Sequence, residues 1–139
     1  MKFYILMFVS IAFFSLNHCT NSSSQIEARL RELKSDLEKT ICTKTIDCAK
    51  QEISKIPLAH RNMIPAFMQS ESACLSFFKT KFEEAEKKQI EKNFKMTNAI
   101  LDDYESCISA LEKTSCEEYT GTTGQLKISG CENMKKYSL

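Results

Sequence analysis

The sequence predicts an all-α fold: a disulfide-stapled bundle of about four helices with a glycine-containing loop near the C-terminus. The residues that break helices are confined to two places, because the prolines, Pro57 and Pro65, lie close together and every glycine lies at or after Gly121. Between Pro65 and Gly121 the chain is rich in Glu, Lys, Ala, Leu and Phe, a composition that favours helix over sheet. Seven cysteines in 139 residues supply the candidates for disulfides.

Residues 1–24 have the order of a secretory signal. Lys2 precedes an apolar run from Phe3 to Leu16, and a polar stretch ends the segment. A charged start, an apolar centre of about 7–15 residues and a processing site are typical of such signals. The run is shorter than the ~20 residues that a membrane-spanning helix needs, which argues against an uncleaved anchor. The expected organisation is a signal peptide over residues 1–18, a flexible tether over 19–24 and one helical domain over 25–139.

The first predicted helix runs from residue 25 to residue 40. Ser24 and Glu27 have the spacing of a capping box, and apolar residues then recur at helical spacing: Ile26, Leu30, Leu33 and Leu37. Thr40–Thr45 is expected to be a connection, since clustered threonines are poor helix formers. A shorter second helix ends before Pro57 and is marked by Ile46, Ala49, Ile53 and Ile56. A turn region follows, from Pro57 to Pro65.

The long stretch after Pro65 carries two apolar stripes that differ in phase. The first comprises Leu75, Phe78, Phe82 and Ala85. The second comprises Ile90, Phe94, Thr97, Leu101, Tyr104, Ile108 and Leu111. A single helix over the whole stretch would be about 80 Å long, whereas a domain of this size has a radius of gyration near ~14 Å. We therefore expect a reversal between Glu86 and Asn98 that makes two antiparallel helices, with an extended coiled coil as the alternative. Only Gln125–Ile128 has strand-like alternation.

The end of the export signal resembles that of bacterial lipoproteins. Leu16 and Cys19 match the lipoprotein box, and Asn17 and His18 fill the two positions that usually hold small residues, as in the looser boxes of spirochaete lipoproteins. The chain is thus similar to the small, cysteine-rich, helical lipoproteins of spirochaete-type envelopes, many of which have no assigned activity. The resemblance implies cleavage before Cys19, acyl chains such as palmitate on that cysteine, and anchoring in the bacterial cell envelope at the outer membrane. Cleavage nearby by an ordinary signal peptidase is the alternative.

With Cys19 assigned to lipid, the remaining cysteines form an even set, which in an exported domain is typical of a disulfide framework. They are Cys42, Cys48, Cys74, Cys107, Cys116 and Cys131. We expect Cys116 to pair with Cys131, because that bridge would close the glycine-containing tail. Cys74 would face Cys107 across the reversal between Glu86 and Asn98, or Cys48 across the turn region between the prolines. Because Cys74 can form only one of these bonds, the other pairings stay open. No cysteine pair has the spacing of a zinc site or of a Cys-x-x-Cys redox motif.

Residues with catalytic potential are few. His60 is the sole histidine after processing, and no nucleophile motif lies near it. Two acidic runs are expected to be solvated helix faces rather than paired catalytic carboxylates: Glu83, Glu84 and Glu86, and Asp102, Asp103 and Glu105. We therefore predict no enzymatic activity, no metal site and no cofactor. A net charge of +1 gives no electrostatic footprint for nucleic acid.

The predicted function is that of a lipid-anchored, non-catalytic interaction or structural module with a protein partner. An interaction module predicts an exposed apolar patch. The apolar cluster beside Pro65 is a candidate for an adaptable binding surface, although core packing is the expectation for it: Met63, Phe67 and Met68. One alternative function is a carrier that holds an apolar ligand in a cavity lined by Phe78, Phe82, Phe94 and Leu101. The other is a periplasmic enzyme inhibitor.

Overall fold

The computed structural model describes residues 23–91, 95–121 and 128–137 and confirms the all-α, disulfide-stapled fold. No strand occurs among the described residues. In chain order the elements are α1 (Ser23–Ile53), the 3-10 helices η1 (Leu58–Met63) and η2 (Ala66–Met68), α2 (Glu71–Glu91), α3 (Asn98–Lys113), α4 (Cys116–Gly121) and the 3-10 helix η3 (Glu132–Tyr137). The predicted signal peptide and Cys19 lie outside the described residues. α1 begins at Ser23, two residues before the expected start of the domain.

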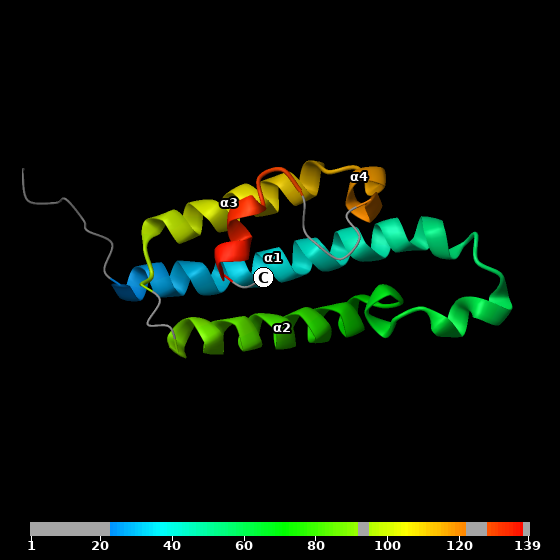
Figure 1. Ribbon diagram of the computed structural model, residues 1–139, viewed down its shortest axis with the longest axis horizontal. Coiled ribbons are helices and arrows are strands. Elements are labelled where there is room, and N and C mark those ends of the chain that lie inside the picture. The colour runs from blue at the N-terminus through cyan, green and yellow to red at the C-terminus, as the bar shows by residue number, and fades with distance from the viewer. Residues whose placement is uncertain (1–22, 92–94, 122–127, 138–139) are drawn as a thin grey trace, which may run out of the picture.

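Helix α1 is the centre of the bundle. Helix α2 packs along one side of it in the opposite direction, and α3 packs along the other side in the same direction (Figure 1). The C-terminal helix η3 packs against both α2 and α3. One hydrophobic core joins these elements, and its buried members are Leu30, Leu33, Leu37, Ile41, Phe82, Ile100, Tyr104, Cys107, Leu111, Ile128, Cys131, Met134 and Tyr137.

Helix α1 is continuous through Thr40–Thr45, so the predicted connection there is wrong. The low helix propensity of threonine costs only a few tenths of a kcal/mol per residue, about 0.7 at most, which tertiary packing readily exceeds. Here Ile41 and Cys42 are buried in the bundle, and Thr45 is only 6% exposed. The Thr45 Oγ1 lies 2.6 Å from the Tyr119 hydroxyl of α4, so a side chain that disfavours helix locally forms a hydrogen bond that fixes the helix in place.

Replacing Thr45 by valine is expected to lower the free energy of unfolding by about 1–2 kcal/mol, because the hydrogen bond to Tyr119 is lost from a part-buried site. Tyr119→Phe removes the same hydrogen bond from the other side. The double variant should therefore cost less than the sum of the two single variants. Urea denaturation of the three proteins measures this coupling, and strictly additive losses would contradict a stabilising role for the hydrogen bond.

The predicted reversal is confirmed, because α2 ends at Glu91 and α3 begins at Asn98. The two helices do not form the expected hairpin, however, since α1 lies between them (Figure 1). The predicted second stripe also has the wrong phase at its start, where Ile90 is 68% exposed. Phe94, another member of that stripe, lies outside the described residues. Within α3 the predicted Tyr104 and Leu111 are buried, and Leu101 and Ile108 pack against the core. The buried stripe also contains Ile100 and Cys107, which were not predicted.

All six cysteines of the domain form disulfides, but the expected Cys116–Cys131 pairing is wrong. The bonds join Cys42 to Cys74, Cys48 to Cys116 and Cys107 to Cys131. Cys74 does not meet Cys107, because α1 rather than α3 is the neighbour of α2. It does bond to α1, but to Cys42 rather than to Cys48, which bonds to α4 instead. Cys131 belongs to the segment that packs on α3, which brings its Cα within 4.4 Å of that of Cys107 and leaves Cys116 to bond α1.

The spacing of two cysteines on α1 explains which helices they reach. Cys42 and Cys48 are six residues apart, and at about 100° per residue their side chains leave the helix in directions that differ by roughly 120°. Cys42 therefore meets Cys74 at the start of α2, and Cys48 meets Cys116 at the start of α4. The bonds hold α2 and α4 to different sides of one central helix.

The C-terminal segment closes the core on α3. Residues 125–127 of the strand-like segment lie outside the described residues, and Ile128 is buried without forming a strand. In η3, the Tyr137 hydroxyl donates to Asp103 Oδ2 at 2.6 Å and the Asn133 amide donates to Asp103 Oδ1 at 2.7 Å. Gly130 makes the turn that precedes Cys131, with a φ of +98° that side-chain-bearing residues rarely adopt.

Substitution of Gly130 by alanine is expected to lower the free energy of unfolding by about 1–3 kcal/mol. The positive φ disfavours any side chain, and the new Cβ would lie 2.9 Å from the Cβ of Ala110 in α3. The exposed neighbour Ser129 is a matched control, whose replacement by alanine should change stability by less than about 0.5 kcal/mol. Chemical denaturation compares the two variants. Equal stability of Gly130→Ala and the parent would show that the turn tolerates another conformation.

Candidate functional site

The segment after α1, residues 57–69, forms the end of the bundle opposite to the first turn of α1, and we call it the tip (Figure 1). It consists of η1 and η2, which follow Pro57 and Pro65 respectively. Both prolines have a φ of −55°, which suits the first position of a tight helical turn. The carbonyl of each proline accepts a backbone hydrogen bond at 2.9 Å, from His60 and Met68. The tip therefore has a regular backbone set by its prolines.

The tip exposes apolar side chains. No residue of η1 or η2 is buried, and Leu58 and Met63 are each 78% exposed. Core packing was the expectation for Met63, Phe67 and Met68, and it is wrong for Met63, while Phe67 and Met68 are half-buried. The short 3-10 turns explain this outcome, because they are too tight to turn every apolar side chain of the tip toward one face.

An aromatic stack joins the tip to α2. The rings of Phe67 and Phe77 lie 4.7 Å apart between centroids and 17° from parallel, although Phe77 is itself 40% exposed. Phe78 meets Phe77 edge-on at 5.3 Å, and the Lys81 ammonium lies 6.0 Å from the centre of the Phe77 ring. The stack holds η2 against the first turns of α2 while leaving aromatic surface open to solvent.

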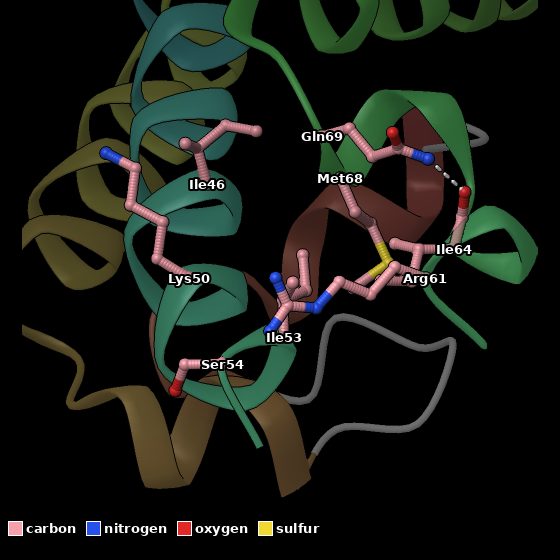
Figure 2. A pocket seen from close by; sticks show the side chains of 8 residues that line it. All are labelled: Ile46, Lys50, Ile53, Ser54, Arg61, Ile64, Met68 and Gln69. Carbon is pink, nitrogen blue, oxygen red and sulfur yellow. Dashed lines mark hydrogen bonds between the residues drawn. The ribbon is translucent and has the colours of Figure 1, made fainter. Parts of the chain in front are cut away.

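A crevice of about 390 Å³ separates the tip from the last turns of α1 (Figure 2). Four apolar and four polar side chains line it: Ile46, Ile53, Ile64 and Met68, and Lys50, Ser54, Arg61 and Gln69. Ile46 and Ile53 come from α1, whereas Ile64 and Met68 come from the tip. The Gln69 amide nitrogen donates to the Ile64 carbonyl, which links two residues of the tip that line the crevice.

Arg61 supplies the charge of this crevice. Its Nε donates to the Ile56 carbonyl at 3.1 Å, which directs the rest of the guanidinium toward Ile53 and α1 (Figure 2). No carboxylate within the described part of the chain forms an ion pair with Arg61. The Lys50 ammonium points away from the crevice and lies 3.6 Å from Asp47 on the same helix.

The chain around the crevice is locally cationic although the whole protein is close to neutral. The lining of the crevice contains two cations, Lys50 and Arg61, and no acid, and Lys50 pairs with Asp47 on its own helix. The Glu52 carboxylate already pairs with Lys55 at 2.8 Å. This end of the bundle therefore presents an uncompensated positive charge beside exposed apolar surface.

A second hollow, of about 560 Å³, lies between α1 and α3. Acids, lysines and threonines make up most of its lining, which comprises Asp36, Lys39, Thr40, Thr43, Lys44, Asp47, Ile108, Leu111 and Glu112. Three carboxylates and two ammonium groups give it no dominant charge, and its apolar surface comes from Ile108 and Leu111. It is a weaker candidate than the crevice beside the tip.

The residues considered for catalysis do not come together. His60 is an exposed residue of η1, and no described side chain forms a hydrogen bond or ion pair with it. Of the first acidic run, Glu83 and Glu84 are exposed, and Glu86 pairs with Lys34 of α1 at 3.2 Å. Glu84 also has its pKa lowered by the hydrogen bond from Lys81. These carboxylates form solvated faces and ion pairs between helices, as the sequence predicted.

The second acidic run is likewise structural. Asp102 is exposed, Glu105 accepts from Arg29 of α1 at 2.9 Å, and Asp103 holds η3 through Tyr137 and Asn133. Burial raises the pKa of Tyr137 to about 12, and its hydrogen bond to Asp103 contributes to the rise. Burial also raises the pKa of two further tyrosines in the bundle, Tyr104 and Tyr119. These hydroxyls stay protonated at neutral pH, so none of them provides a base.

The residues expected to line a ligand cavity lie in and beside the core. Phe82 is buried, and Phe78 and Leu101 pack against the core cluster, while Phe94 lies outside the described residues. None of the three described residues lines the crevice or the second hollow. In the described ranges, no cluster of three or more His, Cys, Asp or Glu side chains has the geometry to hold a metal ion. No helix there is long and apolar enough to cross a membrane.

Comparison with known proteins adds no relative from which residues carry over. The chain matches no protein-family model, no curated protein and no solved structure.

Proposed function

We propose that this protein is a lipid-anchored protein of the bacterial cell envelope that acts as a non-catalytic interaction module. In this proposal the acyl chains on Cys19 hold the N-terminal end of the bundle at the outer membrane. The tip is the surface that meets a protein partner. The observation that carries the proposal is the exposure of Leu58 and Met63 at the end of the bundle farthest from the start of α1.

The length of α1 supports this orientation. The helix begins four residues after Cys19 and has 31 residues, so at 1.5 Å per residue it is about 46 Å long. The direction of α1 places the tip at its far end (Figure 1). An anchor at residue 19 would therefore leave the tip well away from the bilayer surface, where a partner can reach it.

The disulfides support the assignment of Cys19. Six of the seven cysteines are paired within the domain, so the seventh needs another fate in an oxidising compartment. Acylation of Cys19 gives it one. Exported proteins with an odd free thiol are otherwise open to intermolecular pairing.

A photo-cross-linking amino acid in place of Met63 tests the proposal in living cells. The expected result is a discrete adduct between this protein and a second protein, because the side chain at this position projects from the tip. The matched control places the same cross-linker at the exposed Asp102 of α3, away from the tip, where no adduct of that mass should form. Absence of any adduct from position 63, or the same adducts from both positions, would overturn the proposal.

A further inference from the structure

The crevice beside the tip combines four apolar side chains with one cation, Arg61, that forms no ion pair among the described residues. Ile46 and Ile53 of α1 face Ile64 and Met68 of the tip across it (Figure 2). Branched aliphatic side chains and a flexible thioether suit a guest of similar chemistry, because such surfaces adapt to the shape of an apolar side chain. These four side chains alone select for hydrophobicity and not for charge.

Arg61 adds the selection for charge. A guanidinium has five N–H donors, of which the Nε–H is committed to the Ile56 carbonyl. The two Nη groups remain on the crevice side, and their fork geometry matches a carboxylate. The hydrogen bond to Ile56 also holds the group in position in advance, which reduces the entropy lost when a carboxylate binds.

The polar side chains of the lining favour a peptide over an acyl chain. Ser54 donates its hydroxyl proton to the Gln51 carbonyl, and Gln69 donates through its amide nitrogen, so the oxygens of both side chains can accept from a peptide backbone. A fatty acid offers no such donors, and sites for long apolar ligands enclose most of the ligand surface. An open crevice with acceptors in its lining suits an extended segment of protein.

We infer that this crevice recognises a segment of the partner protein in which an apolar side chain lies beside a carboxylate. The apolar side chain enters between α1 and the tip, and the carboxylate pairs with Arg61. The inference rests on the proposed function, since it gives the chemistry of the partner that the tip meets. A lining that contains Lys50 and Arg61 and no acid favours the same acidic partner over a basic one.

Two peptides that differ in one group provide the test: acetyl-leucyl-glutamyl-leucine amide and the same peptide with glutamine in place of glutamate. The full-length chain is labelled with ¹³C at its methionine methyl groups and titrated with each peptide. The Met68 methyl signal, from the crevice, should shift saturably, and that of the buried Met134 should not. The glutamate peptide should bind about tenfold more tightly than the glutamine peptide, as expected for a hydrogen-bonded charge pair.

The variant Arg61→Gln should abolish the preference for glutamate while leaving the methyl spectrum of the core unchanged. Arg31→Gln is the matched control, because Arg31 is an exposed arginine of α1 with no ion pair among the described residues, and the preference should survive there. Equal binding of the two peptides by the parent protein, which requires no variant, would overturn the inference. So would a preference that persists in Arg61→Gln, or a Met68 signal that does not respond to either peptide. If cross-linking from position 63 succeeds despite such a result, the inference fails and the proposed function stands.

Discussion

Removal of the Cys48–Cys116 disulfide by the double substitution Cys48→Ala and Cys116→Ala is expected to lower the free energy of unfolding by about 4 kcal/mol. The bond joins residues 68 positions apart, the longest separation among the three disulfides. The entropy of closing a loop of that length in the unfolded chain corresponds to about 4 kcal/mol. The bond also holds α4 on α1, so its loss should weaken the contact between Tyr119 and Thr45.

The measurement is guanidinium denaturation with Cys19→Ala as the common background, so that no free thiol exchanges with the remaining disulfides. Cys19 takes part in none of the three disulfides, so Cys19→Ala alone should leave the unfolding midpoint unchanged. A loss below about 1 kcal/mol in the double variant would contradict a substantial role for this bond.

Truncation of Leu37 to alanine is expected to cost about 3 kcal/mol of stability. Leu37 is 1% exposed and belongs to the core cluster on the central helix, between elements that pack from both sides. Large-to-small substitutions at such sites lose the transfer free energy of the removed atoms and leave a cavity, for a total of about 2–5 kcal/mol. Urea denaturation measures the loss.

The same substitution at Leu58 is the matched control. Leu58 is 78% exposed at the tip, so Leu58→Ala should change stability by less than about 0.5 kcal/mol. Its expected effect is on partner binding instead, and it should weaken the cross-linked adduct formed from position 63. Comparable destabilisation by Leu37→Ala and Leu58→Ala would contradict the assignment of one residue to the core and the other to an interaction surface.

The helices were predictable because their determinants are local. The prolines set the end of the first long segment, and the change in stripe phase placed the reversal between α2 and α3 correctly. The break at Thr40–Thr45 was predicted wrongly for a non-local reason. Thr45 is held in the helix by Tyr119, a residue 74 positions away, and no pattern in the sequence indicates that contact.

The disulfide pairing was not predictable for a related reason. Which cysteines meet depends on the order in which helices pack, and the antiparallel hairpin assumed for residues 71–113 placed α2 beside α3. The structure places α1 between them, which changes the neighbour of both Cys74 and Cys107. The even number of cysteines and the predicted export of the chain were enough to predict that these six form disulfides. Which cysteine bonds to which depends on how the helices pack, and the sequence does not show that.

The candidate site could be predicted only in part from the sequence. The apolar cluster beside Pro65 was recognised, but composition alone favours burial for methionine and phenylalanine. Arg61 was missed, because nothing in the sequence indicates that its Nε binds the Ile56 carbonyl and that it lies across from α1.

The central claim is that Cys19 carries the membrane anchor of a disulfide-stapled domain, and intact mass of the protein purified from membranes tests it most directly. The expected mass is that of residues 19–139 plus acyl chains, less the six hydrogens lost in forming three disulfides. A full-length mass, or free thiols after denaturation, would contradict the claim.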